Sequence, residues 1–259
     1  MFTYYLMISI SIATWLYYKQ INKKNRIIYG FIITFLFLIC ITTAIRKAIF
    51  IPIIFWFAYV FIISINRRRL IGGILKVILS IALILIGYSL LMYNEYFAST
   101  VGRRMEGFIA GVLGTGESDN SFNIRMLLIK SAIESFMTYP IFGYGFGAFR
   151  DYADNMINIR LYAHNNYLEL LASSGIIGFI IYYGIVILIF KKLYIRFKKL
   201  GNVMFAFGIA LIISLLANDF AVVSYLSLPY MTILSILACL CKISIDNNTE
   251  NISDEVRFK

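Results

Sequence analysis

The feature that most constrains this chain is a series of apolar runs, each about 17–23 residues long. A helix needs about 20 mostly apolar residues to cross a bilayer, whereas a barrel strand needs about ten alternating ones. Hydrophobic residues make up 61% of the 259 residues and charged residues only 14%, which is too apolar for the surface of a soluble domain. Because backbone amides in lipid must be paired within the protein, the runs predict an all-α membrane protein.

Seven runs predict membrane-spanning helices, and they divide the chain into four parts. Residues 1–92 hold four spans, 93–166 form one long polar segment, 167–242 hold three spans, and 243–259 form a tail. The fifth span is short as drawn, and we expect it to begin earlier, within 165–174. The predicted spans are Phe2–Tyr18, Ile27–Ile45, Ala48–Ile65, Leu70–Met92, Gly175–Phe190, Val203–Ala217 and Val222–Leu240.

The distribution of positive charge predicts the orientation. The formal net charge is +11, but the basic residues gather in short loops at alternate ends of the spans, which argues against a nucleic-acid partner. Short loops rich in lysine and arginine stay in the cytoplasm. We therefore expect a multi-pass protein of the plasma or inner membrane, with 93–166 outside and the tail inside. The cytoplasmic clusters are Lys19, Lys23, Lys24 and Arg26; Arg67, Arg68 and Arg69; Lys191, Lys192, Arg196, Lys198 and Lys199; and Lys242, Arg257 and Lys259.

The three cysteines, Cys40, Cys239 and Cys241, lie in or at the edge of predicted spans. Cys239 and Cys241 are two residues apart and so lie on different faces of a helix. We interpret all three as packing residues and predict neither a disulfide nor a metal site.

The long polar segment contains a predicted amphipathic helix at 121–138. A segment of this length is usually more than a connector. On a helical wheel, the apolar residues form one broad face, with Lys130, Ser131, Glu134 and Ser135 opposite. Arg125 falls in the middle of the apolar arc, where a guanidinium must reach water, find a partner or face a polar cavity. The apolar face consists of Met126, Leu128, Ile129, Ala132, Ile133, Phe136 and Met137.

After this helix, Pro140 is followed by glycines at alternate positions, Gly143, Gly145 and Gly147. Glycine permits an irregular backbone that approaches its neighbours closely. The spacing matches neither the dinucleotide nor the nucleotide-triphosphate fingerprint. A structural turn is therefore the favoured interpretation, and a substrate-contacting loop is the alternative.

Three predicted outer-face residues could act on a substrate together. His164, the single histidine, suits proton transfer near neutral pH. Arg46 lies at the outer end of two spans, where basic residues are disfavoured, so it is either a snorkelling side chain or a functional one. Arg125 and Arg46 would suit a diphosphate, which indicates group transfer from a diphosphate-linked donor without a metal. Alternatives stay open for two of the further predicted substrate contacts. A solvated turn is the default interpretation of Asp219, and Asn165, like Glu169, could instead cap the helix or orient His164. The further predicted contacts are Asn165, Gly143, Gly145, Lys47 and Asp219.

The order and spacing of these motifs resemble the O-antigen ligase/polymerase family. The matching segments are Asn123-Ile-Arg-Met-Leu-Leu-Ile-Lys-Ser-Ala132, Tyr139-Pro-Ile-Phe-Gly-Tyr-Gly-Phe-Gly-Ala-Phe149, Ala163-His-Asn-Asn-Tyr-Leu-Glu-Leu-Leu171 and Gly175-Ile-Ile-Gly178. Thr42-Thr-Ala-Ile-Arg-Lys-Ala48 looks like a shorter motif of the family, with Ile45 where a serine is commoner.

The resemblance implies a GT-C-like membrane glycosyltransferase acting on an undecaprenyl-diphosphate-linked glycan at the extracytoplasmic face. His164 would be the general base for an acceptor hydroxyl, and Arg125 and Arg46 would bind the diphosphate. Inversion at the anomeric carbon, without cofactor or divalent metal, is implied. The partners would be the lipid-linked donor, a glycan or lipid-linked acceptor, membrane lipids and a chain-length regulator protein.

Three alternatives stay open. The enzyme could be a ligase rather than a polymerase, although low proline and an abundance of lysine, isoleucine and asparagine favour a polymerase of capsule or similar surface polysaccharide. Family members usually have ten or more spans, so the chain could be an inactive fragment that lacks N-terminal helices. A multi-pass polysaccharide transporter would need charges within several spans, and only Lys76 qualifies.

Overall fold

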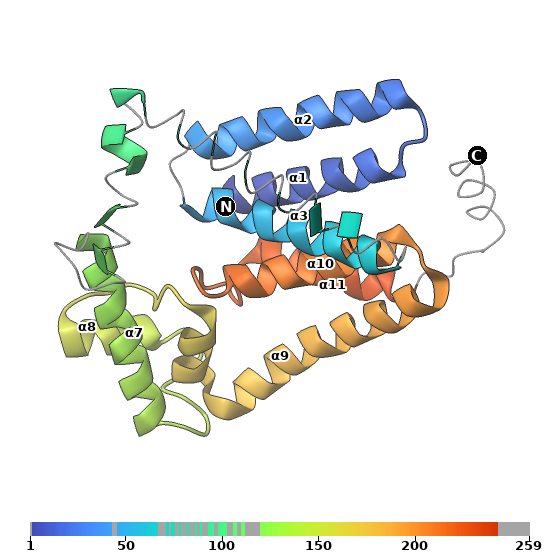
Figure 1. Ribbon diagram of the computed structural model, residues 1–259. Helices are drawn as coiled ribbons and strands as arrows, with labels where there is room; N and C mark the ends of the chain where they lie inside the picture. The colour runs from blue at the N-terminus through green and yellow to red at the C-terminus, as the bar shows by residue number, and fades with distance from the viewer. Residues whose placement is uncertain are drawn as a thin grey trace. The chain divides into compact units, whose positions relative to one another are not determined.

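The computed structural model describes residues 2–42, 46–66, 120–242 and scattered positions between 71 and 111. Within these residues every regular element is helical, which confirms the all-α prediction (Figure 1). The fourth predicted span, Leu70–Met92, lies largely outside the described residues. The elements are α1 (Phe2–Lys19), α2 (Lys23–Thr42), α3 (Arg46–Asn66), a short helix η1 (Ala98–Gly102), α7 (Asn120–Thr138), α8 (Phe149–Ile157), α9 (Asn166–Leu200), α10 (Val203–Asn218) and α11 (Leu228–Leu240).

The chain divides into two compact units. The first comprises Met1–Gly73, Ile185–Ala217 and Leu228–Lys259, and the second comprises Ile74–Gly184 and Asn218–Ser227. Helix α9 contributes residues to both units because the boundary falls between Gly184 and Ile185. All of the polar contacts described below belong to the second unit.

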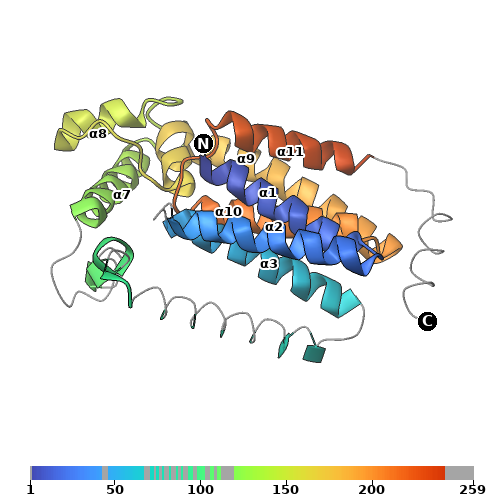
Figure 2. The same ribbon diagram turned by 90° about the horizontal axis from the view of Figure 1, so that it is seen from above.

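In the first unit, α1 packs against α2 and α3 (Figure 2). Leu6, Ile10 and Cys40 form a buried cluster between α1 and α2. Cys40 and Cys241 are buried thiols and Cys239 is an exposed one. The cluster shows that apolar side chains pack between α1 and α2.

One described helix, α9, is long and apolar enough to cross a membrane, and α10 and α11 are shorter apolar helices. Helix α9 begins at Asn166, within the range where the fifth span was expected to begin. Helix α11 begins at Leu228, six residues after the predicted start at Val222. The difference arises because residues 218–227 form a loop that is hydrogen-bonded to the start of α9, and Pro229 suits the first turn of a helix.

In the second unit, α7 and α8 pack together around a small apolar core (Figure 1). The fully buried members of this core are Leu128, Ala132, Phe149, Ala153, Ala163 and Ala172. The core therefore joins α7 and α8 to the segment that carries His164 and to the first turns of α9.

The buried face of α7 differs from the apolar face predicted for it. Leu128, Ser131, Ala132 and Ser135 are buried, whereas the predicted face members Met126, Ile133 and Met137 are exposed. Ser135 Oγ donates a weak 3.5 Å hydrogen bond to the Ala172 carbonyl of α9. The buried stripe thus combines Leu128 and Ala132 of the predicted apolar face with Ser131 and Ser135 of the opposite face.

Helix α9 is interrupted at Gly175, where φ is 63° and ψ is −167°. The interruption exposes backbone groups of α9, and the loop after α7 binds them. The Ala172 and Ser173 carbonyls accept hydrogen bonds from Tyr144 N (2.8 Å) and Gly145 N (3.0 Å). In return, Ile176 N (2.9 Å) and Ile177 N (3.4 Å) donate to the carbonyls of Pro140 and Ile141. The loop and the kinked helix therefore satisfy each other's backbone.

Two glycines permit this exchange. Gly143 has φ of 72°, and a Cβ there would collide with the backbone of Ser173. Gly175 has φ of 63°, and a Cβ there would collide with the backbone of Ile141. L-residues with side chains rarely adopt such φ values. The structure thus confirms that the alternating glycines form a structural turn.

Candidate functional site

His164 lies in a short segment between α8 and α9 and is half-buried. Its φ is 53°, a left-handed conformation that histidine adopts more readily than bulky or β-branched residues. Its neighbour Ala163 is buried in the core of the second unit. The backbone at the histidine therefore turns sharply, immediately before α9 begins.

A carboxylate fixes the residue before the histidine. Ala163 N donates a 2.6 Å hydrogen bond to Glu169 Oε2, and Glu169 is only 1% exposed. Asn165 Oδ1 accepts a 3.2 Å bond from Leu168 N and so caps the start of α9. Asn165 therefore caps the helix, whereas Glu169 holds the segment before His164.

A buried network fixes the residue at the start of α9. Asn166 Oδ1 accepts hydrogen bonds from Ser224 N (2.7 Å) and Tyr225 N (3.0 Å). Asn166 Nδ2 donates to Tyr183 Oη (2.9 Å) and, more weakly, to Asp219 Oδ2 (3.4 Å). The backbone nitrogen of Asn166 donates to the Asp219 carbonyl at 2.7 Å. The 218–227 loop is thus tied to the first residue of α9.

Asp219 is the acceptor at the centre of this network. Its carboxylate accepts a 2.9 Å bond from Tyr183 Oη and a 2.5 Å bond from Ser224 Oγ. Asp219 is fully buried, so the expectation of a solvated turn was wrong. The carboxylate therefore holds side chains of its own unit together, and the substrate contact at Asp219 stays a prediction.

Next to the histidine segment, three buried polar atoms lack a hydrogen bond of good geometry. They are Glu169 Oε1, Ser173 Oγ and Tyr225 Oη. Burial raises the pKa of the Tyr225 hydroxyl, with a further rise from the charge of Glu169, while the nearby Ser173 hydroxyl, Gly147 backbone and Arg150 guanidinium oppose that rise. Buried polar groups without partners are rare in native proteins and concentrate at functional positions. The three residues belong to the same unit as His164, and Glu169 is bonded to the residue before the histidine.

The structure divides the predicted site residues between the two units. His164, Asn165, Arg125, Gly143, Gly145 and Asp219 belong to the second unit, whereas Arg46 and Lys47 begin α3 in the first. The side chains of Arg46 and Lys47 lie outside the described residues. A common site of Arg46 with His164 therefore stays a prediction.

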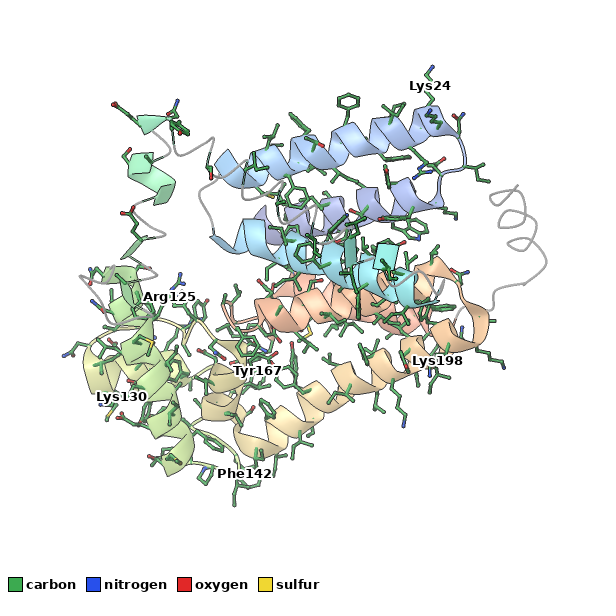
Figure 3. All side chains as sticks on the ribbon, viewed as in Figure 1. Lys24, Arg125, Lys130, Phe142, Tyr167 and Lys198 are labelled. Atoms are coloured by element: carbon green, nitrogen blue, oxygen red, sulfur yellow. The ribbon has the colours of Figure 1, made fainter. Side chains whose placement is uncertain are left out.

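Arg125 is exposed on α7, so its guanidinium reaches the surface rather than a buried apolar arc. Figure 3 shows it on the N-terminal half of the helix, with Lys130 further along. Arg150, on α8, lies with its guanidinium carbon 4.1 Å from the centre of the Tyr162 ring. This cation–π contact is a second attachment of the segment that precedes the histidine.

Sequence reasoning missed most of the residues that hold the histidine turn. Asn166, Ser224 and Tyr183 were not singled out, whereas Glu169 was named as a residue that could orient His164 or cap the helix. One signal was present: Asp219 is the single acidic residue between Glu169 and Asp246. An isolated carboxylate between apolar helices needs donors, and those donors are the residues that were missed.

Among the described residues every element is helical, and one of the helices, which begins just after the turn at His164, is apolar and long enough to cross a membrane. This arrangement is consistent with an all-α membrane protein. A family model for O-antigen ligase matches residues 31–183, more than half of the chain, while no curated protein matches it. The chain belongs to the O-antigen ligase family. Members of this inner-membrane family are glycosyltransferase-like ligases and polymerases of polysaccharide assembly.

Proposed function

We propose that this chain is a membrane glycosyltransferase that polymerises or ligates undecaprenyl-diphosphate-linked oligosaccharides at the extracytoplasmic face. The observation that carries the proposal is the fixed turn at His164. The residue before it is bound to Glu169, and Asn166, two residues after it, is bound to the 218–227 loop. Catalysis by proton transfer requires a base held in position, and this turn supplies one.

In the proposed reaction, His164 takes the proton of an acceptor sugar hydroxyl. The acceptor oxygen attacks the anomeric carbon of the donor and forms the new glycosidic bond. The bond from that carbon to the diphosphate breaks, and the lipid diphosphate leaves with the bonding electrons. Attack from the side opposite the leaving group inverts the anomeric configuration.

The departing diphosphate needs positive charge, which Arg125 and Arg46 would supply. Guanidinium groups bind phosphate oxygens in a bidentate manner and stabilise charge that develops during bond cleavage. Arg125 is exposed on α7 in the same unit as His164 and thus has access to a ligand. With two arginines in this role, the proposed mechanism requires no divalent metal.

The experiment is complementation of a strain that lacks the gene, with surface polysaccharide read as a ladder on gels. His164→Asn is the sharpest variant because asparagine tolerates the left-handed backbone but is a far weaker base. Asn158→Ala is the matched control, since Asn158 has nearly the same φ, 54°, at the end of α8.

At matched membrane expression, we expect wild type and Asn158→Ala to restore long chains and His164→Asn to leave single lipid-linked units. A full ladder with His164→Asn would remove the histidine from the reaction. Loss of the ladder with both variants would show that any substitution at these turns disrupts the protein, and the loss with His164→Asn would then not support a role for the imidazole. Transfer of the accumulated units to a lipid A core instead of to another glycan would identify a ligase.

A further inference from the structure

The loop between α7 and α8 has an unusual composition for a segment predicted to lie outside the membrane. No charged residue occurs from Ser135 to Phe149. Its tip is apolar and open, with Phe142 75% exposed and Ile141 55% exposed. Met137, in the last turn of α7, is 73% exposed. Figure 3 shows the Phe142 side chain pointing away from the ribbon. A membrane protein keeps such residues exposed where lipid covers them.

The tip is attached to the part of α9 that faces outward with apolar side chains. Pro140 and Ile141 accept hydrogen bonds through their carbonyls from Ile176 N and Ile177 N. Ile176, Ile177 and Ile180 are themselves exposed on α9. The exposed residues of the loop and of the helix therefore form one continuous surface, which we call the loop patch: Met137, Ile141, Phe142, Ile176, Ile177 and Ile180.

The depth of this surface follows from the length of α9. The first charged residue after the apolar stretch of α9 is Lys191. A hydrocarbon core about 30 Å thick takes about 20 helical residues, and about 20 residues before Lys191 lies Leu171. Ile176 and Ile177, together with the loop tip bonded to them, therefore fall within the hydrocarbon region.

Part of the loop backbone is paired within the protein. Irregular backbone at membrane depth is tolerated only where protein covers and satisfies its polar groups. Gly143 N, Tyr144 N and Gly145 N are bonded to protein carbonyls, and Pro140 has no N–H to satisfy. Tyr139 and Tyr144 flank the tip with their rings 5.5 Å apart, and tyrosine favours the membrane–water interface.

We propose that the loop between α7 and α8 dips into the lipid bilayer, with the loop patch in contact with acyl chains. The loop is then a membrane-embedded hairpin bound to the kink of α9, rather than part of an aqueous extracytoplasmic domain. It anchors α7 to the membrane at the end of the helix where Met137 lies.

The test uses the full chain in vesicles of phosphatidylethanolamine and phosphatidylglycerol. Cys40, Cys239 and Cys241 are replaced by alanine, and single cysteines carry a nitroxide spin label. Collision with oxygen, which concentrates in lipid, is compared with collision with a water-soluble nickel complex. The readout reports lipid contact and does not require enzymatic activity.

Phe142→Cys and Ile141→Cys are the test positions, both on exposed side chains that can be changed without disturbing packing. Ile180→Cys is the lipid control, and Met156→Cys on α8, which is exposed near Asp154, is the water control. We expect the oxygen-to-nickel ratio at Phe142→Cys and Ile141→Cys to equal that at Ile180→Cys and to exceed that at Met156→Cys. A ratio equal to that at Met156→Cys, or low collision rates with both reagents because protein covers the loop, would overturn the proposal.

Discussion

The backbone nitrogen of Ala163 donates a 2.6 Å hydrogen bond to Glu169 Oε2, six residues later in the chain. The bond joins the residue before His164 to the first turn of α9, so His164 lies between the two bonded residues in the chain. On the other side of the histidine, Asn166 binds the backbone of Ser224 and Tyr225. The histidine turn is therefore held from two directions by residues that never touch a substrate in the proposed reaction.

Replacing Glu169 by alanine should loosen this turn. The Ala163 N–H would lose its acceptor in a buried position, which costs about 1–3 kcal/mol, and His164 would be less well placed. We expect Glu169→Ala to lower polysaccharide yield strongly, with thermal unfolding of the purified protein shifted to lower temperature. Glu169→Gln keeps an acceptor oxygen and should retain most of the activity. Equal loss in the two variants would point to the charge of Glu169 instead of its hydrogen bond.

Asn166→Ala should be more disruptive than Glu169→Ala because it removes partners from several buried groups at once. The backbone N–H groups of Ser224 and Tyr225 would lose their acceptor, at about 1–3 kcal/mol each. We expect a large drop in unfolding temperature in detergent. Asn166→Asp keeps the acceptor but places a second carboxylate close to Asp219, so it should also destabilise. Leu161→Ala, at an exposed position in the same segment, serves as the control and should change little.

The backbone hydrogen bonds between the α7–α8 loop and α9 predict how glycine substitutions change stability. Gly143→Ala and Gly175→Ala each force a side chain against backbone at a positive φ, and we expect each to destabilise by about 2–4 kcal/mol. Gly184→Ala lies in the regular part of α9 with open space around it, so it should be neutral or slightly stabilising. Unfolding of the purified variants measures the difference, and similar stability of all three would show that the loop does not pack on the kink.

Arg125 and Lys130 allow a comparison of two cations on one helix (Figure 3). If Arg125 binds the donor diphosphate, loss of a charge-assisted hydrogen bond worth about 1.5–3 kcal/mol should reduce activity by tenfold or more. We expect Arg125→Ala to shorten or abolish the polysaccharide ladder at unchanged expression, while Lys130→Ala preserves it. Arg125→Lys should recover only part of the activity because lysine cannot bind a phosphate in a bidentate manner. A ladder unaffected by Arg125→Ala would assign the diphosphate to other residues.

Several features could be predicted from the sequence because their signals are local. The apolar runs predicted the helices, including the long apolar helix that became α9. The glycine alternation after Pro140 predicted a structural turn, and Gly143 does have the φ that only glycine adopts easily. The family resemblance rested on motifs within residues 123–178 and agrees with the family match at 31–183. In each case neighbouring residues in the chain carry the information.

The tertiary structure decided which surfaces pack and which residues hold the site. Hydropathy reports which side chains avoid water, but in a membrane protein lipid can satisfy them, so α7 packs through Leu128, Ser131, Ala132 and Ser135 and leaves Met137 exposed. Asn166 and Asp219 are 53 residues apart, and no local pattern links them. What the sequence determined by itself is the apolar helices among the described residues and the motif around His164. The short helix α8 and the hydrogen bonds that fix that histidine depend on groups brought together only when the chain folds.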